Sequence, residues 1–261
     1  MNKNLKFFLV SVAILFLLSS CNKQTDDKKE MQLNSKDVAS VDSNFDAWER
    51  FLGCWEHEIS DIQKKKNKTQ PSLWKKTQRL SVDSIDALEK RLKSRLPQSY
   101  RDFLTVSNGQ FQLLGQLSWN FSDSAFHSID KVILFANSSG QPHKAWINAY
   151  EDTEVPDEEY FVYGEKQNVP AIRAIYLNEA IEISHFPAKV EEFILLNPHV
   201  KTQNGEFETW WLSPRHPGAM RYKTFADFMI SIYYEEIHNG SWDPTESQIA
   251  DSCGKYIYKR Y

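Results

Sequence analysis

The sequence predicts an α+β domain with a mostly antiparallel sheet flanked by N- and C-terminal helices, preceded by a helical extension. Two patterns indicate this fold class. Helical periodicity begins near residue 44 and returns near residue 224, and short apolar runs separated by turn residues lie between. The chain of 261 residues is 41% hydrophobic and 25% charged, which excludes a polytopic membrane protein. Its net charge of −4 offers no basic field for nucleic acid.

The first twenty residues are typical of an export signal. Lys3 and Lys6 precede a nearly unbroken apolar run at 7–18, which as a helix reaches about 18 Å and is shorter than the roughly 30 Å hydrocarbon core of a bilayer. We therefore interpret residues 1–20 as a cleaved signal peptide. The sequence Leu-Ser-Ser-Cys at 18–21 resembles a bacterial lipobox, which predicts Cys21 as the acylated first residue of the mature chain. An ordinary secretory signal with a chance cysteine is the alternative.

Residues 21–43 are predicted to form a flexible tether. They are rich in Asp, Lys, Gln, Asn and Ser and have almost no apolar side chains to bury. Asn22 is not aspartate, so the enterobacterial sorting rule, applied by resemblance, places the lipoprotein at the outer membrane, on its periplasmic or surface face. The pair Asp26-Asp27 offers a surface-export signal as an alternative reading.

A long amphipathic helix is expected in the extension, residues 44–79. Ser43 can cap it, and the Lys64–Lys66 run and Pro71 end it. Its apolar positions recur at three- and four-residue steps: Phe45, Trp48, Phe51, Leu52, Trp55, Ile59 and Ile62. His57 and Glu58 lack the second histidine of a zinc-protease motif, so no metal site is expected there.

Two further helices are predicted after residue 80. Ser81 or Asp83 caps the first, Pro97 separates the two, and Asn108-Gly109 closes the second with a left-handed turn. Their inward-facing residues are Ile85, Leu88 and Leu92, then Tyr100, Phe103 and Leu104.

The middle of the chain is predicted to form strands, and its end a helix. The final helix begins at Thr224, with Asp227 in the capping-box position. The strands are expected at Val132–Phe135, Tyr160–Tyr163, Ile172–Leu177, Ala180–Ser184, Phe193–Leu196 and Phe207–Leu212.

Two ordered blocks of residues resemble the SUKH superfamily, which includes the yeast Smi/Knr cell-wall assembly regulators. The first runs from Ile85 to Gly109 and the second from Phe193 to Phe225, so the resemblance predicts a SUKH-like domain at 80–240 and a C-terminal tail at 241–261. The motif residues, which the resemblance assigns to the fold, are Glu89, Leu96, Pro97, Tyr100, Gly109, Asn197, Pro198, Glu206, Trp210, Pro217, Gly218 and Phe225.

The resemblance implies a protein-binding module without catalysis or cofactor. Many bacterial members are immunity proteins that neutralise toxins, and the yeast relatives regulate wall synthesis through partners. Glu206 and Glu208 alternate on a predicted strand, which would place both carboxylates on one face and leaves a wall hydrolase as the alternative. The seven histidines show no metal-ligand spacing, so we predict no metal site.

Two cysteines remain after lipidation of Cys21, namely Cys54 and Cys253. Outside the cytoplasm they can form a disulfide that closes a loop of about 200 residues. Two separate buried thiols are the alternative, because Cys54 lies beside the apolar stripe of its helix.

An acidic run between 151 and 159 is the clearest candidate for partner binding. Its carboxylates would attract a basic protein, such as a toxin or an envelope protein. A solvated loop before the strand at Tyr160 is the alternative. Trp119 is a candidate aromatic anchor. The acidic residues are Glu151, Asp152, Glu154, Asp157, Glu158 and Glu159.

Overall fold

The first predicted helix is confirmed in the computed structural model, which describes residues 44–66, 74, 79–111, 126–151, 153–186, 191–238 and 243–261. Helix α1 spans Asn44–Lys65. Most of its predicted apolar stripe is buried, including Trp48, Phe51 and Trp55, none of which is exposed to solvent. The described residues all belong to one unit, 42–261; Cys21 and the tether lie outside them.

The two predicted helices after residue 80 also form as expected. Helix α2 spans Val82–Leu92, and the Ser81 hydroxyl accepts the Ser84 N–H at its start. Helix α3 spans Gln98–Ser107 and begins directly after Pro97. Asn108 and Gly109 both have positive φ, so they form the predicted left-handed turn.

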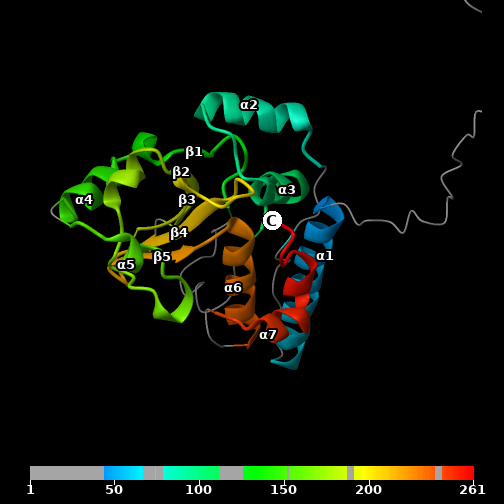
Figure 1. Ribbon diagram of the computed structural model, residues 1–261. Helices are drawn as coiled ribbons and strands as arrows, with labels where there is room; N and C mark the ends of the chain where they lie inside the picture. Colours follow the sequence, from blue (N-terminus) through cyan, green and yellow to red (C-terminus); the bar gives the residue numbers. More distant parts are fainter. Residues whose placement is uncertain are drawn as a thin grey trace, which may run out of the picture. The chain divides into compact units, whose positions relative to one another are not determined.

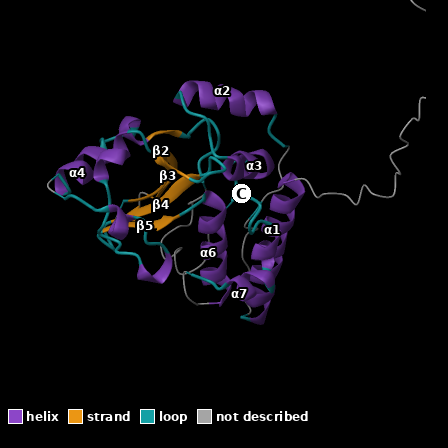
Figure 2. Ribbon diagram, viewed as in Figure 1, coloured by secondary structure: helices purple, strands orange, loops and turns teal. Residues whose placement is uncertain are grey.

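The sheet is an antiparallel meander of five strands in sequence order, and Figure 2 draws strands in orange. Each strand pairs with the next one along the chain, and short connections favour this arrangement from β2 to β5, whereas a long segment joins β1 to β2. The strands are β1 (Ile133–Leu134), β2 (Ile181–Phe186), β3 (Glu192–Lys201), β4 (Phe207–Ser213) and β5 (Gly218–Tyr222).

Both faces of the sheet are buried, because successive side chains point to opposite faces and each face has its own cover. Ile194 and Leu196 join the core under α1, α3 and α6 (Phe225–His238), whereas Phe193 and Leu195 join a second core. The second core is covered by the chain between β1 and β2, which includes α4 (Pro142–Ala149) and α5 (Asp157–Tyr160) (Figure 1).

The C-terminal segment packs into the first core together with α1. Helix α7 spans Glu246–Ala250 and a 3-10 turn follows at Cys253–Tyr256. The Trp48 indole N–H donates to the Tyr261 hydroxyl at 2.7 Å, which in turn donates to the Asp102 carboxylate at 3.0 Å. The regions predicted as an extension and a tail therefore share a hydrophobic core with the rest of this unit.

Two predicted strands are wrong. Tyr160 ends the short helix α5, and a 3-10 helix at Ala174–Asn178 overlaps the predicted strand 172–177. Both segments bury aromatic and aliphatic side chains in the second core without pairing with a neighbouring strand. Helix α4 and strand β5 had no counterpart among the predicted elements.

The final helix begins as predicted, because the Thr224 hydroxyl accepts the Asp227 N–H at 3.0 Å. Among the described residues, no helix combines the length and the apolar character that a membrane span requires.

Candidate functional site

The acidic run follows α4 and extends into α5, on the outer side of the layer that covers the second core. Its residues differ in what they contact. Asp157 pairs with the Arg173 guanidinium, and Glu159 accepts a hydrogen bond from the Asn168 amide. Glu151, Glu154 and Glu158 are exposed and form no ion pair within the described part of the chain. Asp152 and Trp119 lie outside the described residues.

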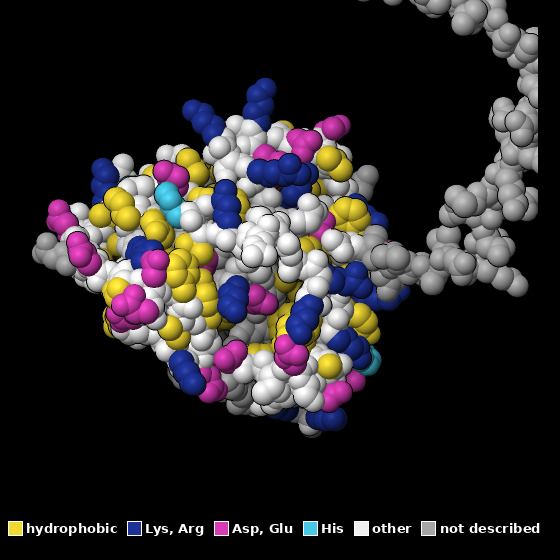
Figure 3. Space-filling view, in the orientation of Figure 1, with side chains coloured by type: hydrophobic (Ala, Val, Ile, Leu, Met, Phe, Trp, Pro, Cys, Tyr) yellow, Lys and Arg dark blue, Asp and Glu magenta, His cyan; other side chains and the backbone are white. Residues whose placement is uncertain are grey.

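A pocket of about 840 Å³ opens beside this run. Glu151 and Glu154 belong to its lining; we call it the acidic pocket. Its floor and walls are largely apolar and aromatic, and they come from α4, the 153–156 loop and the 3-10 helix: Ile147, Tyr150, Val155, Ala174, Ile175 and Tyr176. Figure 3 shows carboxylates and hydrophobic side chains together on the side of the molecule where Figure 1 places α4 and α5.

Two exposed apolar side chains lie in or near the acidic pocket: Ile175 lines it, and Phe161 lies beside its lining residue Arg173. Ile175 is 62% exposed and Phe161 is 46% exposed, although both would gain by burial. Large apolar side chains that lie beside a concave surface are typical of a binding site rather than of a solvated loop.

Arg173 fixes the shape of the pocket and does not make it positive. Its guanidinium donates to the Val155 carbonyl at 2.8 and 3.1 Å and pairs with Asp157. It also lies over the Tyr160 ring, 4.5 Å from the centroid. Because this cation is already paired with a carboxylate, Glu151 and Glu154 leave the mouth of the pocket negative.

A separate buried cluster surrounds Glu208 on the sheet. The carboxylate is fully buried and accepts hydrogen bonds from the Tyr160 hydroxyl (2.6 Å), the Asn197 amide (2.9 Å) and the Trp210 indole (2.6 Å). Arg221, also fully buried, has its Nη1 at 3.6 Å from Glu208. Burial and the negative charge of Glu208 raise the pKa of Tyr160. Glu208 thus accepts hydrogen bonds from three neighbouring side chains and lies beside a buried cation.

Glu206 and Glu208 do not share a site, so the predicted pair on one face is wrong. Glu206 precedes β4 and turns towards the start of α3, where it accepts hydrogen bonds from the Ser99 N–H and hydroxyl. Burial raises the pKa of Glu206. Its contacts satisfy a donor at the N-terminus of the helix, which is a structural role.

Other motif residues also contact the interior of the fold. The Glu89 carboxylate accepts the Leu96 N–H at 2.7 Å and pairs with Arg101, which fixes the turn between α2 and α3. A Cβ on Gly109 would lie 2.1 Å from the His127 carbonyl oxygen, and one on Gly218 would lie 2.1 Å from that of Val169. The remaining members are the buried Tyr100, Phe225 and Pro97, the partly buried Pro198, and Pro217, which is exposed and precedes β5.

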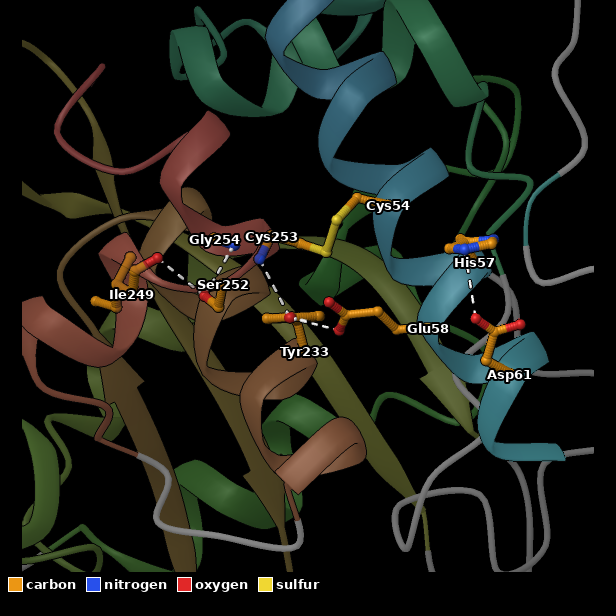
Figure 4. The surroundings of a disulfide bond; sticks show 9 residues. All are labelled: Cys54, His57, Glu58, Asp61, Tyr233, Ile249, Ser252, Cys253 and Gly254. Atoms are coloured by element: carbon orange, nitrogen blue, oxygen red, sulfur yellow. Dashed lines mark hydrogen bonds and ion pairs between the residues drawn. A yellow bond between two sulfur atoms is a disulfide. The ribbon is translucent and has the colours of Figure 1, made fainter. Parts of the chain in front are cut away.

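Cys54 and Cys253 form a disulfide, with their Cα atoms 5.8 Å apart (Figure 4). The sequence leaves open a disulfide or two separate buried thiols, and the structure contains the disulfide. The bond joins α1 to the C-terminal 3-10 turn across 199 positions of sequence.

The sequence indicates the acidic side of the pocket but not its walls. Ile175 and Tyr176 fell within a predicted strand, and Ile147 and Tyr150 lay in a segment with no predicted element. Pro142 at the start of α4 was an available signal, because proline favours the first turn of a helix.

A comparison with protein-family models supplies the family. The model described as the SMI1 / KNR4 family (SUKH-1) matches residues 79–231. This range includes the motif residues, the sheet and the acidic pocket. Among curated proteins, none matches the sequence. Because the matched range covers more than half of the sequence, the chain belongs to the SMI1/KNR4 family (SUKH-1).

Proposed function

We propose that this protein is a membrane-anchored binding module that captures a protein partner at the acidic pocket and acts as an immunity protein against a toxin. Members of the family fit immunity-like or cell-wall-related modules, are generally non-catalytic and typically bind protein partners. The observation that carries the proposal is an apolar pocket with exposed carboxylates at its mouth and the exposed Ile175 in its lining.

The pocket suits a partner that presents an apolar side chain beside a basic one. The apolar side chain would be buried against Ile147 and Tyr176, and the basic one would face Glu151 and Glu154. Carboxylates at the rim of an interface mainly accelerate association, whereas the buried apolar contact slows dissociation.

The anchor in this proposal is Cys21, acylated after removal of residues 1–20. Several acyl chains hold a protein at a membrane much more firmly than one does. An anchored immunity protein would therefore meet a toxin that acts in the envelope. Labelling cells with an alkynyl fatty acid tests this step: the chain should be labelled, and Cys21→Ser should abolish the label.

The test of immunity is a protection assay. Deleting the gene should make cells sensitive to a toxin delivered by sibling cells, and the unaltered chain should restore protection. The double variant Glu151→Lys/Glu154→Lys should reduce protection, because it reverses the charge at the pocket mouth. Asp130→Lys/Asp251→Lys is the matched control, since both aspartates are exposed and neither lines the pocket.

A deletion strain that is no more sensitive than its parent to any neighbouring or sibling toxin would end the immunity proposal. A wall-regulating role would instead give a defect in wall assembly, and the same two double variants would show whether it uses the acidic pocket. A hydrolase would release fragments from purified peptidoglycan, and turnover that Glu206→Gln abolishes would contradict binding without catalysis.

A further inference from the structure

Three potential metal ligands converge at the disulfide. Cys54 and Glu58 are four residues apart on α1, so they lie on the same face of the helix. Cys253 approaches this face from the C-terminal 3-10 turn, and the two sulfur atoms and a Glu58 carboxylate oxygen all lie within 4.8 Å of one another. Figure 4 shows Glu58 reaching towards the sulfur atoms, whereas His57 points away from them and pairs with Asp61.

The Glu58 carboxylate is held in place by hydrogen bonds. The Tyr233 hydroxyl donates to its Oε2 at 2.7 Å, and the same hydroxyl accepts the Cys253 N–H at 3.2 Å. Glu58 and Cys253 are thus linked through one tyrosine. Hydrogen bonds of this kind orient metal ligands and increase affinity.

The group is accessible to an ion. Cys54 and Glu58 are partly exposed, whereas Cys253 is buried. A site with one buried ligand and two at the surface has an entry path, and it leaves room for water as a further ligand.

We propose that reduction of the disulfide turns this group into a Zn²⁺ site formed by Cys54, Cys253 and Glu58. A dithiol reductant supplies two electrons and two protons, which convert the disulfide into two thiols while the dithiol becomes a disulfide. Zn²⁺ then displaces both thiol protons into water and binds two thiolates, one carboxylate oxygen and one water.

The geometry suits this ion. Tetrahedral Zn²⁺ with Zn–S bonds of about 2.3 Å holds its two sulfur atoms about 3.8 Å apart. The Cα separation of 5.8 Å allows that distance through side-chain rotation alone. Thiolates favour Zn²⁺ over Mg²⁺ or Ca²⁺, which prefer ligand sets made of oxygen.

The experiment uses the full chain carrying Cys21→Ser, which leaves Cys54 and Cys253 as its only cysteines. The chain is reduced with a phosphine, freed of reductant without air and titrated with Co²⁺ and then Zn²⁺. The reduced chain should bind one Co²⁺ with the absorption of a tetrahedral thiolate complex, and Zn²⁺ should displace it. The oxidised chain should show no such absorption.

Three variants assign the ligands. Cys54→Ser should abolish the thiolate absorption, and Glu58→Gln should weaken Zn²⁺ binding at least tenfold while leaving both thiols in place. Asp61→Asn is the matched control, because it removes a carboxylate from the same helix outside the group, and its affinity should equal that of the parent.

Three results would overturn the proposal. The first is a reduced chain that binds no Co²⁺. The second is a Cys54→Ser variant that still binds one metal ion per chain, and the third is a Glu58→Gln variant whose Zn²⁺ affinity equals that of the parent. If reduction unfolds the chain, circular dichroism with and without Zn²⁺ tests the site instead. Refolding on addition of Zn²⁺ supports the site, and a chain that stays unfolded contradicts it.

Discussion

Replacing Glu208 by glutamine should destabilise the protein by about 3–5 kcal/mol, the range observed when one partner of a buried ion pair is removed. Glu208 and Arg221 are both fully buried, and Oε1 of the carboxylate accepts the Tyr163 hydroxyl at 3.0 Å and lies 3.6 Å from Arg221 Nη1. Both carboxylate oxygens accept hydrogen bonds, so an amide N–H₂ group in place of either oxygen would point a donor at another donor. It would also leave the guanidinium without a counter-charge.

Urea unfolding followed by tryptophan fluorescence measures this loss. Exposed Glu158→Gln is the control and should change the free energy of unfolding by less than about 0.5 kcal/mol. Arg221→Met in the Glu208→Gln background should recover part of the loss, because it removes the unpaired charge. A loss below about 1 kcal/mol for Glu208→Gln alone would refute the view that this cluster holds the sheet to its cover.

Three further outcomes are expected from unfolding measurements. The double variant Cys54→Ala/Cys253→Ala should lose about 2–5 kcal/mol in oxidising buffer, since its loop is 199 residues long; a melting temperature that neither the variant nor a reductant changes would contradict this. Burial and Glu236 raise the pKa of Glu235 to about 8. The folded state therefore keeps a proton that the unfolded state releases above pH 4.5, so stability should fall as the pH rises towards 8. Glu235→Gln should reduce this fall while leaving stability at pH 4 unchanged. If the free energy of unfolding changed with pH in the same way in the variant and the parent, the effect would be excluded. Gly109→Ala should cost more than about 2 kcal/mol because its Cβ meets a backbone carbonyl. Gly205→Ala, at a similar positive φ in open space, should cost about 1 kcal/mol, and equal costs would argue against the clash.

The parts of the fold that could be predicted are those with a long repeating pattern or a distinct cap. Helix α1 has a buried stripe through Trp48 and Trp55, and α2 and α6 directly follow Ser81 and Thr224, whose hydroxyls accept backbone N–H groups. The strands β2 to β4 are apolar runs bounded by turns. These signals are local, so one sequence is enough to read them.

The cover of the second core could not be predicted in the same way. Short apolar runs do not distinguish a strand from a buried turn, because periodicity needs several repeats to be visible. Tyr160 and Leu177 are fully buried in the second core from α5 and a 3-10 helix rather than from strands. The acidic pocket forms within this cover, so its walls were not predicted even though its carboxylates were.

The separation of Glu206 and Glu208 has a related cause. Alternation puts every second residue on one face only inside a regular strand. The pairing of β3 with β4 shifts register between Asn197 and Lys201, and Glu206 lies next to this irregularity, before β4 begins. A sequence pattern carries no sign of such a shift.

Site-directed photo-crosslinking in cells tests most directly whether the acidic pocket binds a protein partner. A photoreactive residue at Ile175 is compared with one at Val82, because both positions are 62% exposed and Val82 lies at the start of α2 outside the pocket. The proposal predicts a discrete crosslinked protein from position 175 that Glu151→Lys/Glu154→Lys diminishes, and none from position 82. Equal crosslinking from the two positions, or none from position 175, would contradict it.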